Sequence, residues 1–286
     1  MGIDTGDILG MTILEQSVVF FKTIYAQIIS LLTTSPQDFK DGDVWVVISG
    51  IHGAITAIGI SLLVIYFLMG LVKTSTTITE VKRPEVAFRL FVRFVLAKAL
   101  VTYSMNLVLW LIEVSQGLVN LVFGSNSMYN LAFGSMPSGL TDAIDALAWY
   151  EQIVMWLPQF LGGVMIVGLS IAILISIYGR FFKLYMYVAF SPIPLASFAS
   201  SNTQNMGILF LKNLASVVLQ VSVVALACMI FSAFMDSGSL GFNLPNTDSA
   251  IGILFFYIVE LLINMLIFFG LVKISDRITK DILGLS

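Results

Sequence analysis

The stretch VWVVISGIHGAITAIGISLLVIYFLMGLV, residues 44–72, decides the fold class, because it contains no Asp, Glu, Lys or Arg. A helix of roughly 20 apolar residues is enough to cross the hydrocarbon core of a bilayer. The whole chain of 286 residues has the same character, since 58% of it is hydrophobic. Charged residues make up 11%, against about 25% in a soluble domain. We therefore expect an all-α, polytopic membrane protein.

Four further apolar runs are also long enough to span a bilayer. They cover residues 94–123, 153–178, 207–235 and 251–272. Residues 181–206 differ from these runs, because their apolar part is short and because Pro192 and Pro194 remove two backbone donors and break a helix. We expect this segment to be a re-entrant element buried among five spanning helices.

Residues 1–43 are expected to form an extracytoplasmic segment that precedes the transmembrane domain of residues 44–286. Apolar residues recur at helical spacing over 12–33, but polar residues interrupt them too often for a span. This pattern predicts an amphipathic helix that lies in the membrane interface.

The distribution of Lys and Arg orients the chain, because basic residues are concentrated in cytoplasmic loops. If the N-terminus is outside and 181–206 is re-entrant, the C-terminus is inside and 12 of the 14 basic residues are cytoplasmic. These twelve are Lys73, Lys82, Arg83, Arg89, Arg93, Lys98, Arg180, Lys183, Lys212, Lys273, Arg277 and Lys280. We therefore expect an outer N-terminus and an inner C-terminus.

Three of the spans carry polar side chains that share one helix face. They are Asn106, Glu113 and Asn120 in the second span, Asn213 and Gln220 in the fourth, and Glu260 and Asn264 in the fifth. Charged and amide groups are costly in hydrocarbon, so they face protein or water. Two interpretations stay open: the stripes line an aqueous path, or they join helices through hydrogen bonds, with the glutamates protonated.

Small side chains recur every four residues on two spans, where they favour close helix packing within or between subunits. They are Ser49, Gly53, Ala57 and Ser61 in the first span, and Gly168, Ala172 and Ser176 in the third.

The chain carries no recognisable enzyme signature. With one cysteine, Cys228, and one histidine, His52, it has neither an intramolecular disulfide nor a multi-histidine metal site. The sequence contains no P-loop and no HExxH motif. We expect no catalytic residue, no metal and no cofactor.

A basic group precedes the second span. From Pro84 to Phe123 we see no helix breaker, so one long helix is expected, with its first turns on the cytoplasmic face. Lys82, Arg83, Arg89 and Arg93 are then candidates for docking a cytoplasmic partner. The alternative is a basic helix start attracted to anionic lipid.

Three segments together resemble the TrbL family, the polytopic inner-membrane subunit of conjugative type IV secretion systems. They are MGLVKTSTTITEVKRPEVAFRLFVRFVLAKALV (69–101), ISIYGRFFKLYMYVAFSPIPLASFASSN (175–202) and KNLASVVLQVSVVAL (212–226). In order they are a basic loop with a long helix, a proline-broken segment and the start of a long span. The chain is most similar to the short form found in conjugative elements of Gram-positive bacteria.

This resemblance implies a channel or scaffold component of a DNA-transfer machine in the bacterial cytoplasmic membrane. It implies a homo-oligomeric ring that associates with cytoplasmic ATPases and other secretion subunits, and that meets the transferred DNA–protein substrate only transiently. The formal net charge of −3 gives no electrostatic reason for stable nucleic-acid binding. The alternative function is an ion-coupled transporter or small-solute channel that uses buried Glu260 and Glu113.

Overall fold

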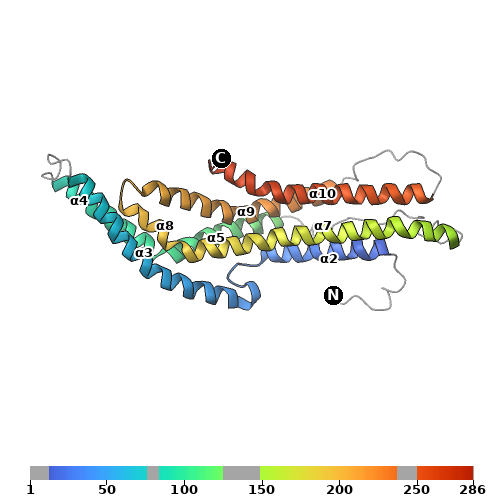
Figure 1. Ribbon diagram of the computed structural model, residues 1–286, viewed down its shortest axis with the longest axis horizontal. Helices are drawn as coiled ribbons and strands as arrows, with labels where there is room; N and C mark the ends of the chain where they lie inside the picture. The colour runs from blue at the N-terminus through green and yellow to red at the C-terminus, as the bar shows by residue number, and fades with distance from the viewer. Residues whose placement is uncertain (1–12, 76–83, 125–148, 237–249, 286) are drawn as a thin grey trace. The chain divides into compact units, whose positions relative to one another are not determined.

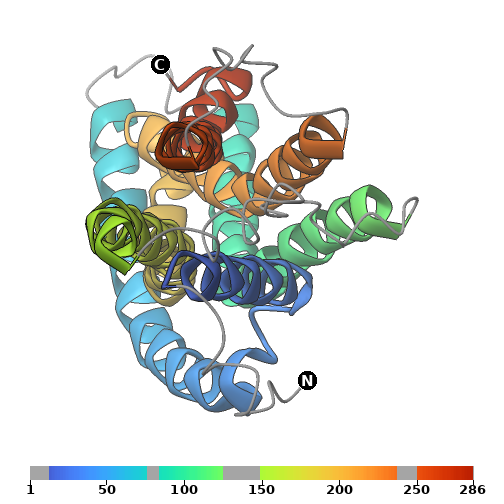
Figure 2. The same ribbon diagram turned by 90° about the vertical axis from the view of Figure 1, so that its right-hand side faces the viewer.

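The computed structural model describes residues 13–75, 84–124, 149–236 and 250–285. In these ranges every regular element is a helix, and both ribbon views show helices alone (Figures 1 and 2). The α-helices are α2 (Ile13–Thr33), α3 (Asp43–Ser75), α4 (Pro84–Thr102), α5 (Ser104–Gly124), α7 (Trp149–Phe190), α8 (Pro192–Ala196), α9 (Gln204–Asp236) and α10 (Ala250–Ile282). Two short 3₁₀ helices, η1 (Phe39–Gly42) and η2 (Ser197–Ala199), adjoin α3 and α8. The expected all-α fold is confirmed.

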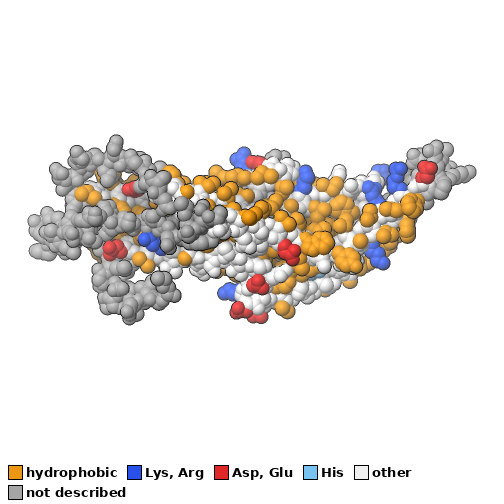
Figure 3. Space-filling model, turned by 180° about the vertical axis from the view of Figure 1, so that it is seen from behind, with side chains coloured by type: hydrophobic (Ala, Val, Ile, Leu, Met, Phe, Trp, Pro, Cys, Tyr) orange, Lys and Arg blue, Asp and Glu red, His pale blue; other side chains and the backbone are white. Residues whose placement is uncertain are grey.

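Six helical segments are long and apolar enough to cross a membrane. They are Ile13–Thr33, Phe39–Lys73, Ser104–Gly124, Trp156–Phe190, Gln204–Met235 and Gly252–Ile282. Five of them overlap the expected spans, and the additional one is α2. Hydrophobic side chains cover much of the described surface on the face drawn in Figure 3, as contact with hydrocarbon requires.

The chain divides into two compact units. Unit 1 comprises Met1–Leu32, Leu121–Tyr178 and Val224–Ser275. Unit 2 comprises Thr33–Asn120, Gly179–Val223 and Asp276–Ser286. The helices α5, α7, α9 and α10 each contribute residues to both units.

Unit 1 contains α2, which lies beside the first part of α7 (Figures 1 and 2). A Cβ atom added at Gly163 of α7 would lie 2.7 Å from Ser17 Oγ of α2, so the two backbones approach closely. The Tyr25 hydroxyl donates a hydrogen bond of 3.1 Å to the carbonyl oxygen of Cys228, and the Tyr25 ring lies 5.5 Å from the Phe268 ring. The sequence predicted an interfacial helix here, whereas α2 packs against other helices of this unit along its length.

Unit 2 has two hydrophobic clusters that hold its helices together. In the first, Val108 and Ile112 of α5 pack with Val188 of α7 and with Leu214 of α9. In the second, Leu63 of α3, Ala97 of α4 and Leu195 of α8 share one core with their neighbours. These clusters anchor α3, α4, α5, α8 and the first half of α9 in one bundle.

The helix expected from Pro84 to Phe123 is interrupted at Tyr103, where α4 ends and α5 begins. Ser104 Oγ donates to the carbonyl oxygen of Val101 at 2.8 Å, and it also bonds His52 Nε2 at 2.9 Å. A serine that bonds back to the preceding turn competes with the helical ladder and favours a bend. Nothing in the local sequence revealed this break, because His52 lies on another helix.

The segment 181–206, which the sequence predicted to be a re-entrant element, comprises the end of α7, the short helices α8 and η2, and the start of α9. Helix α7 continues without a break to Phe190, and α8 then begins at Pro192. The path onward follows α3, since Cβ atoms added at Gly59 and Gly70 would lie 2.9 Å from Pro192 Cβ and 3.3 Å from Ser200 Oγ. The following helix, α9, packs against the end of α7, where its Phe210 ring lies 5.7 Å from the Tyr187 ring.

Candidate functional site

One face of α5 is polar and exposed. Asn106, Glu113 and Asn120 all lie on this face, and none of their side chains has a hydrogen bond to a residue that the structure describes. The opposite face is buried through Val108, Ile112, Ser115 and Val119. The structure thus brings the three predicted side chains onto one surface. Among the described residues they form none of the hydrogen bonds that would join α5 to another helix.

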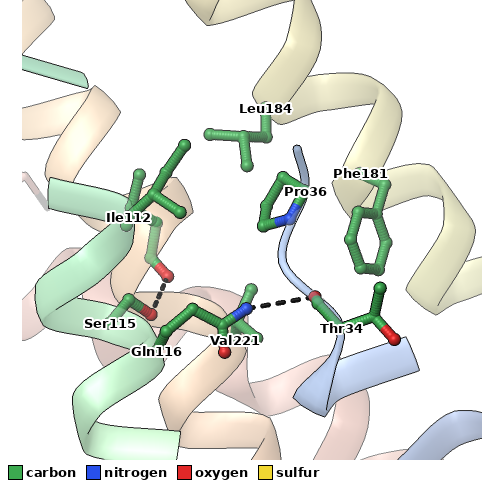
Figure 4. Close-up of a pocket in the computed structure, with 9 residues that line it drawn as sticks. Thr34, Pro36, Ile112, Ser115, Gln116, Phe181, Leu184 and Val221 are labelled. Carbon is green, nitrogen blue, oxygen red and sulfur yellow. Dashed lines mark hydrogen bonds between the residues drawn. The ribbon is translucent and has the colours of Figure 1, made fainter. Parts of the chain in front are cut away.

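The inward polar contacts of α5 come from residues next to that stripe (Figure 4). Ser115 Oγ donates to the carbonyl oxygen of Val218 at 2.8 Å and lies 2.9 Å from Ser222 Oγ. Gln116 Nε2 donates to the carbonyl oxygen of Thr34 at 3.0 Å. These bonds link α5 to α9 and to the segment after α2. The sequence analysis missed Ser115 and Ser222, because serines are frequent in spans and neither lies on the stripe of larger polar residues.

A small cavity of about 10 Å³ lies beside these contacts in unit 2. Its walls are mostly apolar, and Figure 4 shows Pro36, Phe181 and Leu184 opposite Gln116. The buried Oε1 atom of Gln116 has no hydrogen-bond partner among the described residues. A volume of this size is about that of one water molecule, so the cavity is too small for a solute.

The polar residues of α9 in unit 2 range from half-exposed Asn213 to buried Ser216 and Gln220. Asn213 Nδ2 donates to the carbonyl oxygen of Leu209 at 2.9 Å, and Ser216 Oγ donates to Thr279 Oγ1 at 3.3 Å. Gln220 is 3% exposed, and its Oε1 atom lacks a partner within the described ranges. Ser216 therefore joins α9 to the last turns of α10, whereas the Asn213 bond stays within α9 and Gln220 is a buried amide.

The two polar residues of α10 lie in unit 1 and differ in exposure. Glu260 is half-buried, whereas Asn264 is 1% exposed. Asn264 Oδ1 has no hydrogen-bond partner among the described residues. Among all the residues that the structure describes, no three His, Cys, Asp or Glu side chains lie together as metal ligands.

Two basic side chains bond to the start of α9, one to the turn before the helix and one to its first residue. Lys73 Nζ donates to Asn202 Oδ1 at 3.1 Å, and Arg93 Nη2 donates to Gln204 Oε1. Arg89 is exposed on α4. The candidates Lys82 and Arg83 lie outside the described residues. Arg93 thus helps to hold α4 against the first residue of α9, while Arg89 is open to another molecule.

The predicted small-residue stripes do not mark the close contacts inside the units. Gly53, Ala57 and Ser61 are exposed on α3, and a Cβ atom at Gly53 would meet no atom within 4 Å. The other members are half-buried Ser49 in α3, and exposed Gly168 with half-buried Ala172 and Ser176 in α7. Glycines outside the stripes make the close approaches: Gly59 and Gly70 in unit 2, and Gly162 and Gly163 in unit 1.

The helices and their exposed apolar surfaces define a multi-pass α-helical membrane protein. A family model described as TrbL/VirB6 plasmid conjugal transfer like protein matches residues 21–192, which is more than half of the chain. The chain belongs to this family, so it is a membrane component of a conjugal transfer system that works with other subunits of that machinery. The family is a structural one and is not a known enzyme family. No curated protein and no solved structure matches the chain.

Proposed function

We propose that the protein is a channel or scaffold subunit of a conjugative type IV secretion machine, and that it assembles as a homo-oligomeric ring in the bacterial cytoplasmic membrane. The observation that carries this proposal is the family match over residues 21–192. Further support comes from the polar face of α5, which lies within the candidate span Ser104–Gly124 and is exposed on the single chain. Carboxylate and amide groups in a span require protein or water as neighbours, and an assembly of several copies supplies both.

The proposed topology has the N-terminus outside and the C-terminus in the cytoplasm. It rests on the distribution of basic residues, most of which then fall on the inner side. The proline-broken segment around Pro192 and Pro194 packs against α3 at Gly59 and shares a core with Ala97 of α4. The number of crossings proposed is five, with α2 packed against the other helices of unit 1.

The proposed partners are other secretion subunits, including cytoplasmic ATPases, which dock on the basic start of α4. Exposed Arg89 supports this role, because it is close to Arg93 on the same helix and open to another molecule. The transferred DNA–protein substrate passes the ring only transiently. Lys82 and Arg83 belong to the same proposed docking surface.

Deletion of the gene from its conjugative element, with and without the wild-type chain supplied in trans, tests the function. We expect DNA transfer to fall by several orders of magnitude and to return on complementation, while growth of the donor is unchanged. Transfer at the wild-type frequency without the protein would contradict the proposal.

A second candidate function is an ion-coupled transporter or small-solute channel that uses Glu260 and Glu113. The buried, unpartnered Oδ1 atom of Asn264, one helical turn from Glu260, favours it. The exposure of Glu113 on the single chain disfavours it, since this function needs an enclosed site. Flux through purified protein in liposomes that disappears in Glu260→Gln would promote this candidate, and equal flux in both proteins would remove it.

A further inference from the structure

The exposed polar residues of α5 belong to a longer pattern. Asn106, Trp110, Glu113, Gly117 and Asn120 follow one another at alternating spacings of four and three residues, and all five are exposed. We call this row the α5 seam. A repeat of seven residues with two positions per repeat is the pattern by which helices pack side by side in a left-handed supercoil. The seam points away from the side of α5 that is buried in unit 2.

The composition of the seam indicates contact with protein rather than with lipid. Its polar members lie one heptad apart, so that an amide, a carboxyl group and a second amide are stacked at intervals of about 10 Å along the helix. Such groups are costly against hydrocarbon and usually pair with protein groups or water. A Cβ atom added at Gly117 would meet no atom within 4 Å, so another backbone can approach closely at this level.

The spacing also specifies what the partner must offer. It needs hydrogen-bonding groups at the depths of Asn106, Glu113 and Asn120, and no bulky residue against Gly117. Copies of this chain share one orientation in the membrane, so α5 of a second copy presents the same groups at the same depths. An amide both donates and accepts hydrogen bonds, so the Asn106 and Asn120 levels of the seam are each complementary to themselves.

We infer that the α5 helices of neighbouring copies pack in parallel, seam to seam, around the symmetry axis of the assembly. Asn106, Glu113 and Asn120 then form three polar layers across this axis, and Asn106 and Asn120 fix the register as buried asparagines do in coiled coils. The inference rests on the proposed multi-copy function and deepens it, because it names the helix and the residues that make the contact between subunits.

Single-cysteine cross-linking tests this arrangement in the full chain. The variants Asn106→Cys and Asn120→Cys are made in a Cys228→Ser background, which removes the natural thiol. Leu118→Cys is the matched control, because Leu118 is 40% exposed on the same helix but lies off the seam. Oxidation of membranes should convert Asn106→Cys and Asn120→Cys to covalent dimers about tenfold more efficiently than Leu118→Cys, since a disulfide needs Cα atoms within about 7 Å.

Equal cross-linking at Leu118 and at the seam would overturn the inference, as would the absence of dimers at both seam positions in a protein that is still oligomeric. The mass of each variant in native nanodiscs keeps these cases apart. A monomeric mass in the Cys228→Ser background contradicts the proposed ring itself. An oligomeric mass without seam cross-links contradicts only the assignment of α5 to the contact.

Discussion

Gly59 is a point of close approach between α3 and the start of α8. A Cβ atom there would lie 2.9 Å from Pro192 Cβ and 3.0 Å from the Pro192 carbonyl oxygen. On the same helix, a Cβ atom at Gly50 would meet no atom within 4 Å. We therefore expect Gly59→Ala to lower the free energy of unfolding by about 1–3 kcal/mol through overpacking.

The matched control is Gly50→Ala, which should raise stability by up to about 1 kcal/mol through the higher helix propensity of alanine. The measurement is the thermal unfolding midpoint of each variant in the same detergent. A Gly59→Ala midpoint at or above that of Gly50→Ala would show that α8 does not pack on α3 at this position.

At the scale of single residues, the sequence predicted which side chains share a helix face but not which residues contact another helix. The spacing of Asn106, Glu113 and Asn120 predicted that they share a face, because side-chain direction follows from helical periodicity alone. No such rule distinguishes Gly59 from Gly50, since the difference arises from Pro192, which lies far along the chain. For the same reason the bond between Ser115 and Ser222 could not be foreseen.

Among the elements, one carboxylate links the last turns of α10 to the end of α7 within unit 2, beside the Ser216–Thr279 bond to α9. Asp276 Oδ1 lies 3.4 Å from Lys183 Nζ of α7, and Asp276 Oδ2 lies 2.7 Å from Lys280 Nζ. These side chains are partly exposed, and exposed ion pairs contribute up to about 1 kcal/mol. We expect Asp276→Asn to lower the unfolding midpoint in low salt and to have a smaller effect in high salt, because salt screens the pair.

Asp281→Asn is the control for this prediction. Asp281 lies 3.9 Å from Arg277, whose side chain is 85% exposed, so its removal should leave the midpoint unchanged. If both variants behave alike, or if the Asp276→Asn effect is the same in low and high salt, the pairs with Lys183 and Lys280 do not hold this end of α10.

Substitution of two arginines of α4 distinguishes an effect on stability from an effect on docking. Arg93 donates to Gln204, so Arg93→Ala should lower stability by about 1 kcal/mol and also reduce DNA transfer. Arg89 is exposed, so Arg89→Ala should leave the unfolding midpoint unchanged and reduce transfer alone. The two measurements are the midpoint in detergent and the mating frequency. Normal transfer by an Arg89→Ala protein that inserts normally would favour the anionic-lipid interpretation over a docking surface.

At the scale of elements, the length of apolar runs predicted where helices lie, but it did not predict the helix ends that depend on other helices. The runs 44–72, 207–235 and 251–272 fall within long helices, because hydrophobic length is a property of the segment itself. The continuation of α7 to Phe190 and the break at Tyr103 depend on packing partners elsewhere in unit 2. The same applies to α2, whose polar residues suggested an interface although its apolar side chains are buried against α7 and α10.

For the whole molecule, composition and the length of the apolar runs were enough to predict an all-helical, multi-pass membrane protein. The family followed from the arrangement of a basic loop, a long helix and a proline-broken segment, and the match over residues 21–192 confirms it. The pairing of helices within each unit was beyond the sequence, because an apolar stripe packs equally well against many others. The exposed α5 seam is the feature of the single chain that most directly supports contact with further copies of the protein.

The central claim is that this chain works as a symmetric assembly of several copies in the membrane. Electron microscopy of the protein in lipid nanodiscs, combined with its native mass, tests this claim most directly. The account predicts one closed cyclic ring in which α5 faces the axis. A monomer, or a simple dimer with α5 exposed to lipid, would contradict it.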